Sequence, residues 1–258
     1  MAYVSLGRSE KLKDIFIKGS VDPKGIHASP EALEETMRLQ SIFDERMAVM
    51  ATQKEKFFKI SYLNVRSLNS HYDDVAIDNF ILTSDIFGLG ETWLMEDDTK
   101  SFPGFKEHHS SYGRGKGVSV FSKMEDVNRP VVNQAKSNVF SAIQFRTRSF
   151  DAIFLYWSSG CSNEETLDIM NLLDSWIVTD RPTTILGDMN IDFSEDCKLN
   201  NFFEKKGFQQ LIKEPTCDTG SLIDHIYANE SFKKLNIFTQ KSSSYYSDHD
   251  LITIYVPK

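Results

Sequence analysis

Cysteine is scarce in this sequence, and its spacing excludes one common way of stabilising a fold. The 258 residues include three cysteines, Cys161, Cys197 and Cys217, and no two of them form a Cys-x-x-Cys pair. An odd number of widely spaced cysteines indicates neither a disulfide framework nor a zinc site built from paired thiolates. The sequence is therefore typical of a protein in a reducing, intracellular setting.

Long apolar runs and an excess of basic residues are also missing. No apolar stretch approaches the roughly 18 residues needed to cross a bilayer, so we expect no membrane association. The N-terminus carries charged residues and is unlike a secretory signal peptide. With 29 Lys and Arg against 37 Asp and Glu, the formal net charge is −8. That balance argues against a protein that coats nucleic acid through bulk charge.

The composition does supply a folded core. Hydrophobic residues make up 40% of the chain and charged residues 26%, and there are 19 Phe and 9 Tyr. These fractions are those of a soluble globular protein and not of a disordered chain. The length fits one large α/β domain, or one medium domain with an extension.

From residue 58 onward, short runs rich in β-branched and aromatic residues are separated by loops, a pattern typical of strands. Many strands, few helices and no strict βαβ alternation predict an α/β fold in which two packed β-sheets are flanked by helices. The predicted strands are residues 59–63, 86–89, 117–121, 139–146, 151–156, 183–186, 223–228, 235–238 and 251–256.

Helices are predicted at three places. The pattern Ser162-x-x-Glu165 is a capping box that begins one helix. A second helix, residues 198–206, ends at Gly207. The third follows Ser29-Pro30 and runs from residue 32 to about residue 56, which predicts an N-terminal helical extension. In the helix that begins at Ser162, the buried face is predicted to consist of Leu167, Met170, Leu173 and Ile177.

Polar side chains gather where the predicted strands end, and loops at such places usually carry functional groups. A single carboxylate there is most often a solvated turn, but here such clusters recur along one domain. Their carboxylate, amide and imidazole groups suit a hard cation and a phosphate. The residues are Asn64, Glu91, Asp188, Asn190, Asp224, His225, Asp248, His249 and Asp250.

Five motifs contain these residues: Leu63-Asn64-Val65, Glu91-Thr92-Trp93, Gly187-Asp188-Met189-Asn190, Ile223-Asp224-His225-Ile226 and Ser247-Asp248-His249. Taken in order, the motifs resemble those of the endonuclease/exonuclease/phosphatase superfamily, which includes apurinic endonucleases, DNase I-like nucleases and retroelement endonucleases. The resemblance spans residues 57–258 and implies a DNase I-like, four-layer α/β sandwich of two packed mixed β-sheets flanked by helices. Residues 115–118 and 219–224 resemble retroelement members in particular, whereas Arg66 stands where apurinic endonucleases usually have an acid.

The resemblance implies a role for each residue of these motifs. Glu91 is implied as the principal metal ligand, with Asn64 and Asp248 beside it. The metal is expected to be Mg²⁺, with Mn²⁺ as an alternative. Asp188 is implied to orient or deprotonate the attacking water, and Asn190 to hold a phosphate oxygen.

The resemblance also assigns the histidine. His249 is implied to donate a hydrogen bond to the scissile phosphate or to take part in proton transfer, while Asp224 bonds its other ring nitrogen. Whether Asp188 or His249 is the general base stays open. His225 alternates to the other side of its strand, where it is expected to pack in the core.

Three further residues are candidates around this site. Tyr156 matches the position of a tyrosine that contacts phosphate in many members. Arg114 is expected to contact the DNA backbone, although its spacing does not decide this. Trp157 is expected either to stack on a base beside the site or to fill its rim.

The first residues have a resemblance of their own. Residues 2–12 and 22–34 resemble the C-terminal end of PIF1-type helicases, in which the arginine matching Arg8 reaches the nucleotide γ-phosphate. Residues 1–56 are therefore expected to be a helicase fragment and linker helix, as in the Helentron branch of Helitron transposons. No Gly-x-x-x-x-Gly-Lys-Ser/Thr pattern occurs, so ATP binding is not expected in this chain.

Together the motifs predict a Mg²⁺-dependent endonuclease that hydrolyses DNA phosphodiester bonds and derives from a transposable element. A DNA substrate implies a nuclear location, and the oligomeric state is left open. One alternative is a phosphomonoesterase of the same fold, disfavoured because the Trp-Cys-Asp-Arg signature of inositol phosphatases is missing around Asp224. The other is a catalytically dead transposon remnant that only binds DNA or protein.

Overall fold

The computed structural model describes residues 34, 37–38, 41, 56–95, 97–110, 113–123, 131–178, 180–193 and 198–258. The chain forms two compact units, Met1–Thr52 and Gln53–Lys258. In the first unit the four described residues are helical, as predicted for the extension. Arg8 and the rest of residues 1–33 lie outside the described part of the chain, so the helicase resemblance stays a prediction.

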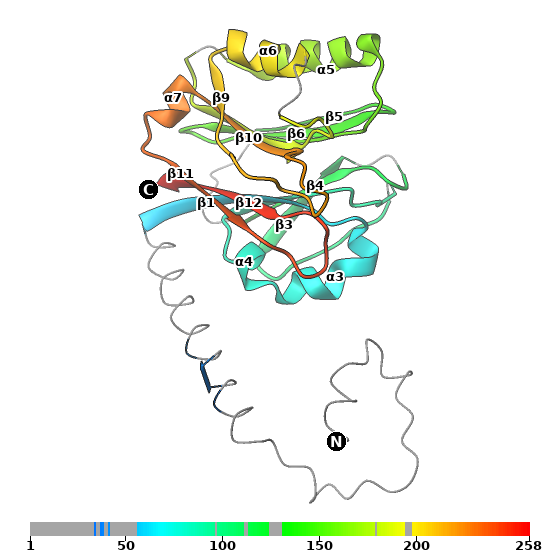
Figure 1. Ribbon diagram of the computed structural model, residues 1–258, viewed down its shortest axis with the longest axis vertical. Helices are drawn as coiled ribbons and strands as arrows, with labels where there is room; N and C mark the ends of the chain where they lie inside the picture. Colours follow the sequence, from blue (N-terminus) through cyan, green and yellow to red (C-terminus); the bar gives the residue numbers. More distant parts are fainter. Residues whose placement is uncertain are drawn as a thin grey trace, which may run out of the picture. The chain divides into compact units, whose positions relative to one another are not determined.

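Two mixed sheets that face each other form the second unit (Figure 1). The first sheet has the strand order β11 (Phe238–Ser242), β12 (Leu251–Pro257), β1 (Phe57–Asn64), β2 (Ile86–Gly90), β4 (Val118–Lys123) and β3 (Phe105–Ser110). The order in the second is β5 (Val131–Lys136), β6 (Phe140–Arg146), β7 (Asp151–Trp157), β8 (Thr183–Asp188), β10 (Asp224–Asn229) and β9 (Phe208–Gln210). The pairs β1/β2 and β7/β8 are parallel, and the other pairs are antiparallel.

Helices cover the two outer faces, so the unit has four layers and the predicted sandwich is confirmed. Figure 1 shows α5 and α6 on the second sheet and α3 and α4 on the first. The capping box of α5 is present, because the Ser162 side chain accepts from the Glu165 backbone and the Glu165 side chain accepts from the Ser162 backbone. The helices are α3 (Leu68–Ile77), α4 (Asn79–Leu82), α5 (Asn163–Trp176), α6 (Lys198–Lys205) and α7 (Glu230–Lys233).

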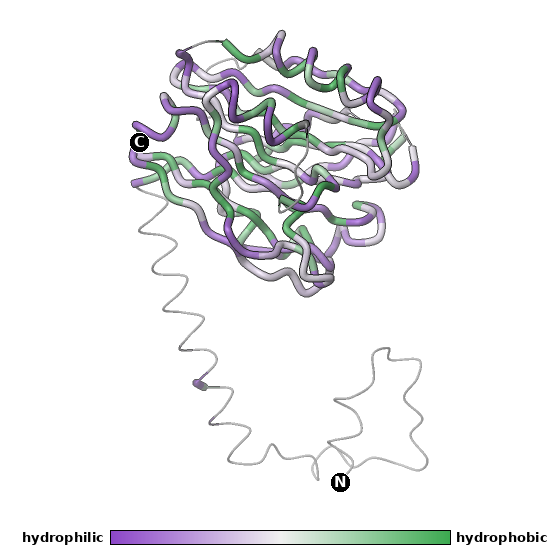
Figure 2. Tube along the Cα trace, turned by 45° about the horizontal axis from the view of Figure 1, so that its top comes forward, coloured by the Kyte–Doolittle hydropathy of each residue, from purple (hydrophilic) through white to green (hydrophobic). Residues whose placement is uncertain are grey.

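The main apolar cluster lies between the sheets. It joins Ile60 and Ile254 of the first sheet to Phe154 and Leu186 of the second, all fully buried. The sheets approach closely at Gly88, where an added Cβ would lie 2.3 Å from the Phe154 ring. Two further clusters lie beneath the outer helices. Figure 2 shows both hydrophilic and hydrophobic stretches along those helices, as expected for elements that bury one face.

Two details of the predicted elements are wrong. The strand predicted over residues 235–238 is displaced: β11 begins at Phe238, because Leu235 closes the turn after α7 by donating from its backbone to Phe232. In α5 the fully buried residues are Ile169 and Leu173, whereas Leu167, placed on the predicted buried face, is 54% exposed. Among the described residues, no helix combines the length and apolarity needed to span a membrane.

Candidate active site

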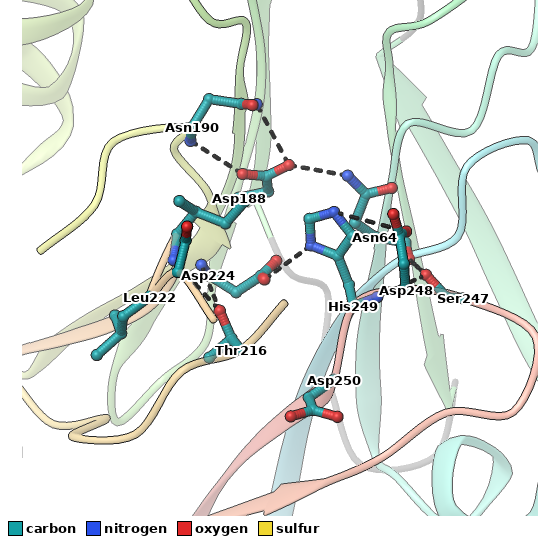
Figure 3. A network of polar contacts seen from close by, with 12 residues as sticks. Asn64, Asp188, Asn190, Thr216, Leu222, Asp224, Ser247, Asp248, His249 and Asp250 are labelled. Atoms are coloured by element: carbon teal, nitrogen blue, oxygen red, sulfur yellow. Dashed lines mark hydrogen bonds and ion pairs between the residues drawn. The ribbon is translucent and has the colours of Figure 1, made fainter. Parts of the chain in front are cut away.

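The ends of several strands bring the motif residues to one end of the two facing sheets. Asn64 is the last residue of β1, and Glu91 directly follows β2, which is parallel to β1. Asp188 is the last residue of β8 and pairs in register with Asp224, the first residue of the antiparallel strand β10. His249 precedes β12, which runs antiparallel to β1. Residues distant in sequence therefore meet at one place (Figure 3).

Asp188 is the centre of the hydrogen-bond network. Its carboxylate, only 1% exposed, accepts from Asn64 Nδ2 at 2.8 Å and from the Asn190 backbone at 2.9 Å. Asn64 Nδ2 also donates to Glu91 Oε1 at 3.0 Å. One amide thus connects two carboxylates that come from different sheets, and it holds them in fixed relative positions.

His249 is held by a second carboxylate. Its Nδ1 lies 2.8 Å from Asp224 Oδ2, and both side chains are buried. The hydroxyl of Thr216 accepts from the Asp224 backbone at 3.0 Å, and that of Ser247 accepts from the His249 backbone at 3.1 Å. Because Nδ1 faces a carboxylate it carries a proton, which leaves Nε2 as the ring nitrogen available to a substrate.

The electrostatics of the two carboxylates and the imidazole are coupled. Burial, together with the charge of Asp224, raises the pKa of Asp188 to about 8. Burial works against protonation of His249, but the hydrogen bond and charge of Asp224 outweigh it and raise the pKa of His249 to about 10. At neutral pH the imidazole is therefore a cation held by Asp224, beside a carboxyl group that titrates near neutrality.

The donor set at this end of the sheets fits a hard divalent cation. Ligand atoms of Asp188, Asp224 and His249 lie within 4.8 Å of one another. Glu91 and Asp248 add two carboxylates, and Asp248 Oδ1 is buried with no hydrogen-bond partner among the described residues. Carboxylate oxygens are the ligands that Mg²⁺ and Mn²⁺ prefer, and a cation would offset both the burial and the repulsion by Asp224 that raise the pKa of Asp188.

Comparison with known proteins identifies the family. The sequence profile of the endonuclease/exonuclease/phosphatase family matches residues 61–249. This chain belongs to that family. The matched region contains every site residue described above. In a separate comparison, no curated protein matches the chain.

Solved structures share the fold of this family member. The endonuclease domain of TRAS1, a telomere-specific non-LTR retrotransposon, is 19% identical with a TM-score of 0.61, over 78% of this chain and 98% of that domain. The 3'-5' exonuclease NExo from Neisseria meningitidis is 17% identical with a TM-score of 0.59, over 77% and 99%. An AP endonuclease from Archaeoglobus fulgidus is 17% identical with a TM-score of 0.58, over 77% and 99%. At these identities the likeness establishes the fold.

Tyr156 and Asn190 also lie at the site of this family member. The Tyr156 hydroxyl donates to the Gly115 carbonyl at 3.1 Å, and burial followed by the charges of Glu91 and Asp188 raises the pKa of Tyr156. Asn190, at a positive φ of 50°, donates from Nδ2 to the Trp157 carbonyl at 2.8 Å and to Asp188 at 3.3 Å. Asn190 therefore contacts Asp188 directly, and Tyr156 lies close enough to Glu91 and Asp188 to be affected by their charges, while the contacts of both residues with phosphate stay predictions.

Trp157 is not brought into the site as a stacking side chain. It follows Tyr156 on β7, so its indole points to the opposite side, where it is 2% exposed and packs among residues beneath α5. Its contribution to the site is its backbone carbonyl. His225 alternates in the same way from Asp224, and its Nε2 lies 2.9 Å from the Ile191 carbonyl in the core, as predicted.

Arg114 is exposed and connects to the site through a residue that sequence reasoning missed. Its guanidinium lies 5.6 Å from the ring centre of Trp93. The Trp93 indole in turn donates to Glu91 Oε2 at 3.4 Å, and the Trp93 backbone has a positive φ of 56°. Trp93 lies in the Glu91 motif, but only the backbone turn, which the sequence does not reveal, directs the indole back to the carboxylate.

One ion pair and one buried tyrosine beside the site were not predicted. Arg66 Nη1 lies 2.7 Å from Asp248 Oδ2, so the basic residue at the position where apurinic endonucleases have an acid pairs with a proposed metal ligand. Tyr62 is fully buried between the sheets, and its hydroxyl has no hydrogen-bond partner among the described residues. Burial, then the charges of Asp188 and Asp224, raise the pKa of Tyr62 well above its usual value.

Proposed function

We propose that this chain is a metal-dependent endonuclease that hydrolyses DNA phosphodiester bonds. The observation that carries the proposal is the convergence of Asp188, Glu91 and Asn64 with a histidine whose Nδ1 is held at 2.8 Å by Asp224. A Mg²⁺ ion bound by Glu91 and Asp248 would supply the positive charge that stabilises the phosphate in the transition state.

His249 is proposed to be the donor to the phosphate. Its imidazole is cationic at neutral pH, since its pKa is raised to about 10, and Asp224 occupies Nδ1. The proton on Nε2 therefore faces the substrate and stabilises the charge that develops on a nonbridging oxygen. A cationic imidazole has no lone pair free to accept a proton.

Asp188 is consequently the proposed general base. Its raised pKa of about 8 makes the ionised carboxylate a stronger base than an ordinary aspartate, and the ionised fraction grows as the pH rises through about 8. Asn64 and Asn190 each donate to one of its two oxygens, so the carboxylate is already oriented when it takes a proton from the attacking water. The long 3.3 Å bond from Asn190 to Asp188 is the one that we expect to exchange for a phosphate oxygen.

DNA is the proposed substrate because of the similar structures and the retroelement-like motifs. TRAS1 is named as an endonuclease of a retrotransposon, and NExo has been solved bound to a product DNA hairpin. We therefore also propose a transposable-element origin and a nuclear location. The exposed Arg114 and Arg66 beside the site are the residues expected to contact the DNA backbone.

Plasmid nicking tests the proposal. Supercoiled plasmid incubated with the full chain and Mg²⁺ or Mn²⁺ should be converted to the open circular form, and EDTA should abolish the conversion. Asp188→Asn and His249→Ala should each lower the nicking rate by about 10²–10⁴-fold, the range for loss of a general acid or base. Asp174→Asn, a matched change of an exposed carboxylate on α5, should leave the rate unchanged.

The outcomes distinguish the alternatives. Nicking that survives both active-site substitutions would show that the site is assigned wrongly. Tight DNA binding without nicking would indicate a catalytically dead remnant. Release of phosphate from a 3'-phosphorylated oligonucleotide or an inositol phosphate, without nicking, would indicate a phosphomonoesterase instead.

A further inference from the structure

Cys217 lies beside the proposed catalytic histidine. A backbone β-bridge pairs Cys217 with His249, although the two residues are 32 positions apart in the sequence. One ligand atom each of Cys217, Asp248 and His249 lie within 4.8 Å of one another. This cluster shares His249 with the cluster of Asp188 and Asp224, but it differs from that cluster because it contains a sulfur donor.

Each of the three side chains has a donor atom that other contacts do not use. His249 Nδ1 bonds to Asp224, so Nε2 is the ring nitrogen that remains. Nε2 lies 3.9 Å from Asp248 Oδ1, a buried oxygen with no hydrogen-bond partner among the described residues, while Arg66 occupies only Oδ2. Cys217 is a free, partly exposed cysteine, so its sulfur is not engaged in a disulfide.

The chemistry of the donors selects the cation. One sulfur, one imidazole nitrogen and one carboxylate oxygen are the mixed donors of three-ligand zinc sites, which keep a fourth position for water, whereas Mg²⁺ takes oxygen ligands almost exclusively. Asp224 behind His249 supplies the carboxylate that usually supports a zinc-bound histidine. The three donor atoms lie within 4.8 Å of one another. Zinc–ligand bonds of about 2.0–2.3 Å would require the distances between these atoms to shorten by only roughly 1 Å.

We propose that Cys217, Asp248 and His249 bind Zn²⁺ at the rim of the active site and that Zn²⁺ bound there inhibits hydrolysis. On binding, the Cys217 thiol and His249 Nε2 each release a proton to the buffer, and one zinc–sulfur, one zinc–nitrogen and one zinc–oxygen bond form without any change of oxidation state. The inhibitory part rests on the proposed function, because inhibition is expected only if the Nε2 proton contacts the phosphate. Zinc binding removes that proton. It also engages Asp248, a proposed ligand of the activating cation.

The binding part is tested without nucleic acid and without activity. The full chain, reduced and then freed of metal, is titrated with Co²⁺, which replaces Zn²⁺ in such sites and gives an intense near-ultraviolet charge-transfer band only when a thiolate is a ligand. We expect one saturable band per chain that added Zn²⁺ removes and excess Mg²⁺ does not. Cys217→Ser should abolish the band, and Cys161→Ser, a matched change at the other described cysteine, should retain it.

The cobalt spectra test the zinc site independently of any nuclease activity. A wild-type chain without a saturable band, or a band that persists in Cys217→Ser protein with an unchanged melting temperature, would overturn the zinc site. His249→Gln should weaken Co²⁺ binding by roughly 10–100-fold, at least the loss seen when an outer-shell partner is removed. An unchanged affinity in that variant would remove the histidine from the site.

The inhibitory part has its own readout in the nicking assay. With Mg²⁺ in excess, Zn²⁺ should slow nicking by the wild-type and Cys161→Ser proteins, whereas Cys217→Ser protein should need about tenfold or more Zn²⁺ for the same loss. Equal inhibition of all three would overturn the inhibitory role. If the wild-type chain does not nick DNA, the proposed function fails, and the cobalt spectra alone decide whether the zinc site exists.

Discussion

Asp224 sets the proton affinity of His249. Its buried carboxylate lies 2.8 Å from Nδ1 and is a main cause of the raised pKa of about 10. We expect Asp224→Asn to lower the pKa of His249 toward its usual 6.5, because asparagine keeps the shape of the side chain but removes its charge. The His249 ring resonances, followed by NMR as the pH is raised, measure this shift. Asp174→Asn should leave the resonances unchanged, and an unaltered His249 titration in Asp224→Asn protein would refute the assignment.

Single residues were predictable from the sequence where a motif fixes them to a strand end. Asn64, Asp188 and His249 each border a strand, and the structure places all three in one network. Cys217 and Tyr62 were not predictable as site residues, because neither belongs to a strand-end cluster of polar groups. Their positions depend on a long-range β-bridge and on the approach of the two sheets, which a one-dimensional pattern does not contain.

At the scale of elements, the position of a strand in its sheet decided whether it was predictable. The interior strands of both sheets coincide with predicted strands, because their buried faces require apolar, β-branched sequence. The edge strands β3, β5 and β9 were not predicted, and β11 was displaced. Edge strands are partly solvated, so polar residues such as those of β3 and β11 are compatible with them and hide the strand pattern.

Gly187 allows β7 and β8 to pair next to the site. An added Cβ there would lie 1.8 Å from the Leu155 carbonyl oxygen, and a backbone atom inside a parallel pair cannot move away easily. We expect Gly187→Ala to lower the free energy of unfolding by about 3 kcal/mol or more, the upper range for overpacking. Gly104→Ala is the control, since nothing lies within 4 Å and only its φ of +82° opposes a side chain, at about 1–2 kcal/mol. Urea unfolding measures both, and equal losses would contradict the packing argument.

The two-sheet unit places Asp188 and Asp224 at strand ends, next to the apolar core between the sheets. The cluster between the sheets excludes water beneath Asp188 and Asp224, and the same exclusion that stabilises the fold raises the pKa of Asp188. The two packed sheets themselves followed from the number of strands, the small number of helices and the lack of strict βαβ alternation. The charge balance at the site did not, because it depends on how deeply the strand ends are buried.

The stability of the metal-free fold should therefore decrease as the pH rises. The pKa of Asp188 is raised from 3.8 to about 8 and that of His249 from 6.5 to about 10, so the folded chain binds both protons more tightly than the unfolded chain. The stabilisation from Asp188 is complete below its unfolded pKa and is lost as the pH rises through about 8, and that from His249 is lost through about 10.

Mg²⁺ should reverse this loss, because it binds the deprotonated acids of the folded chain only. The melting temperature in EDTA should fall between about pH 6 and about pH 9, and the gap between Mg²⁺ and EDTA should widen over the same range, by roughly 2–4 °C for each kcal/mol. Asp188→Asn has no carboxyl to titrate and should show a flatter profile and a smaller gap. A gap that is independent of pH in the wild-type chain would show that the buried acids do not bind the cation.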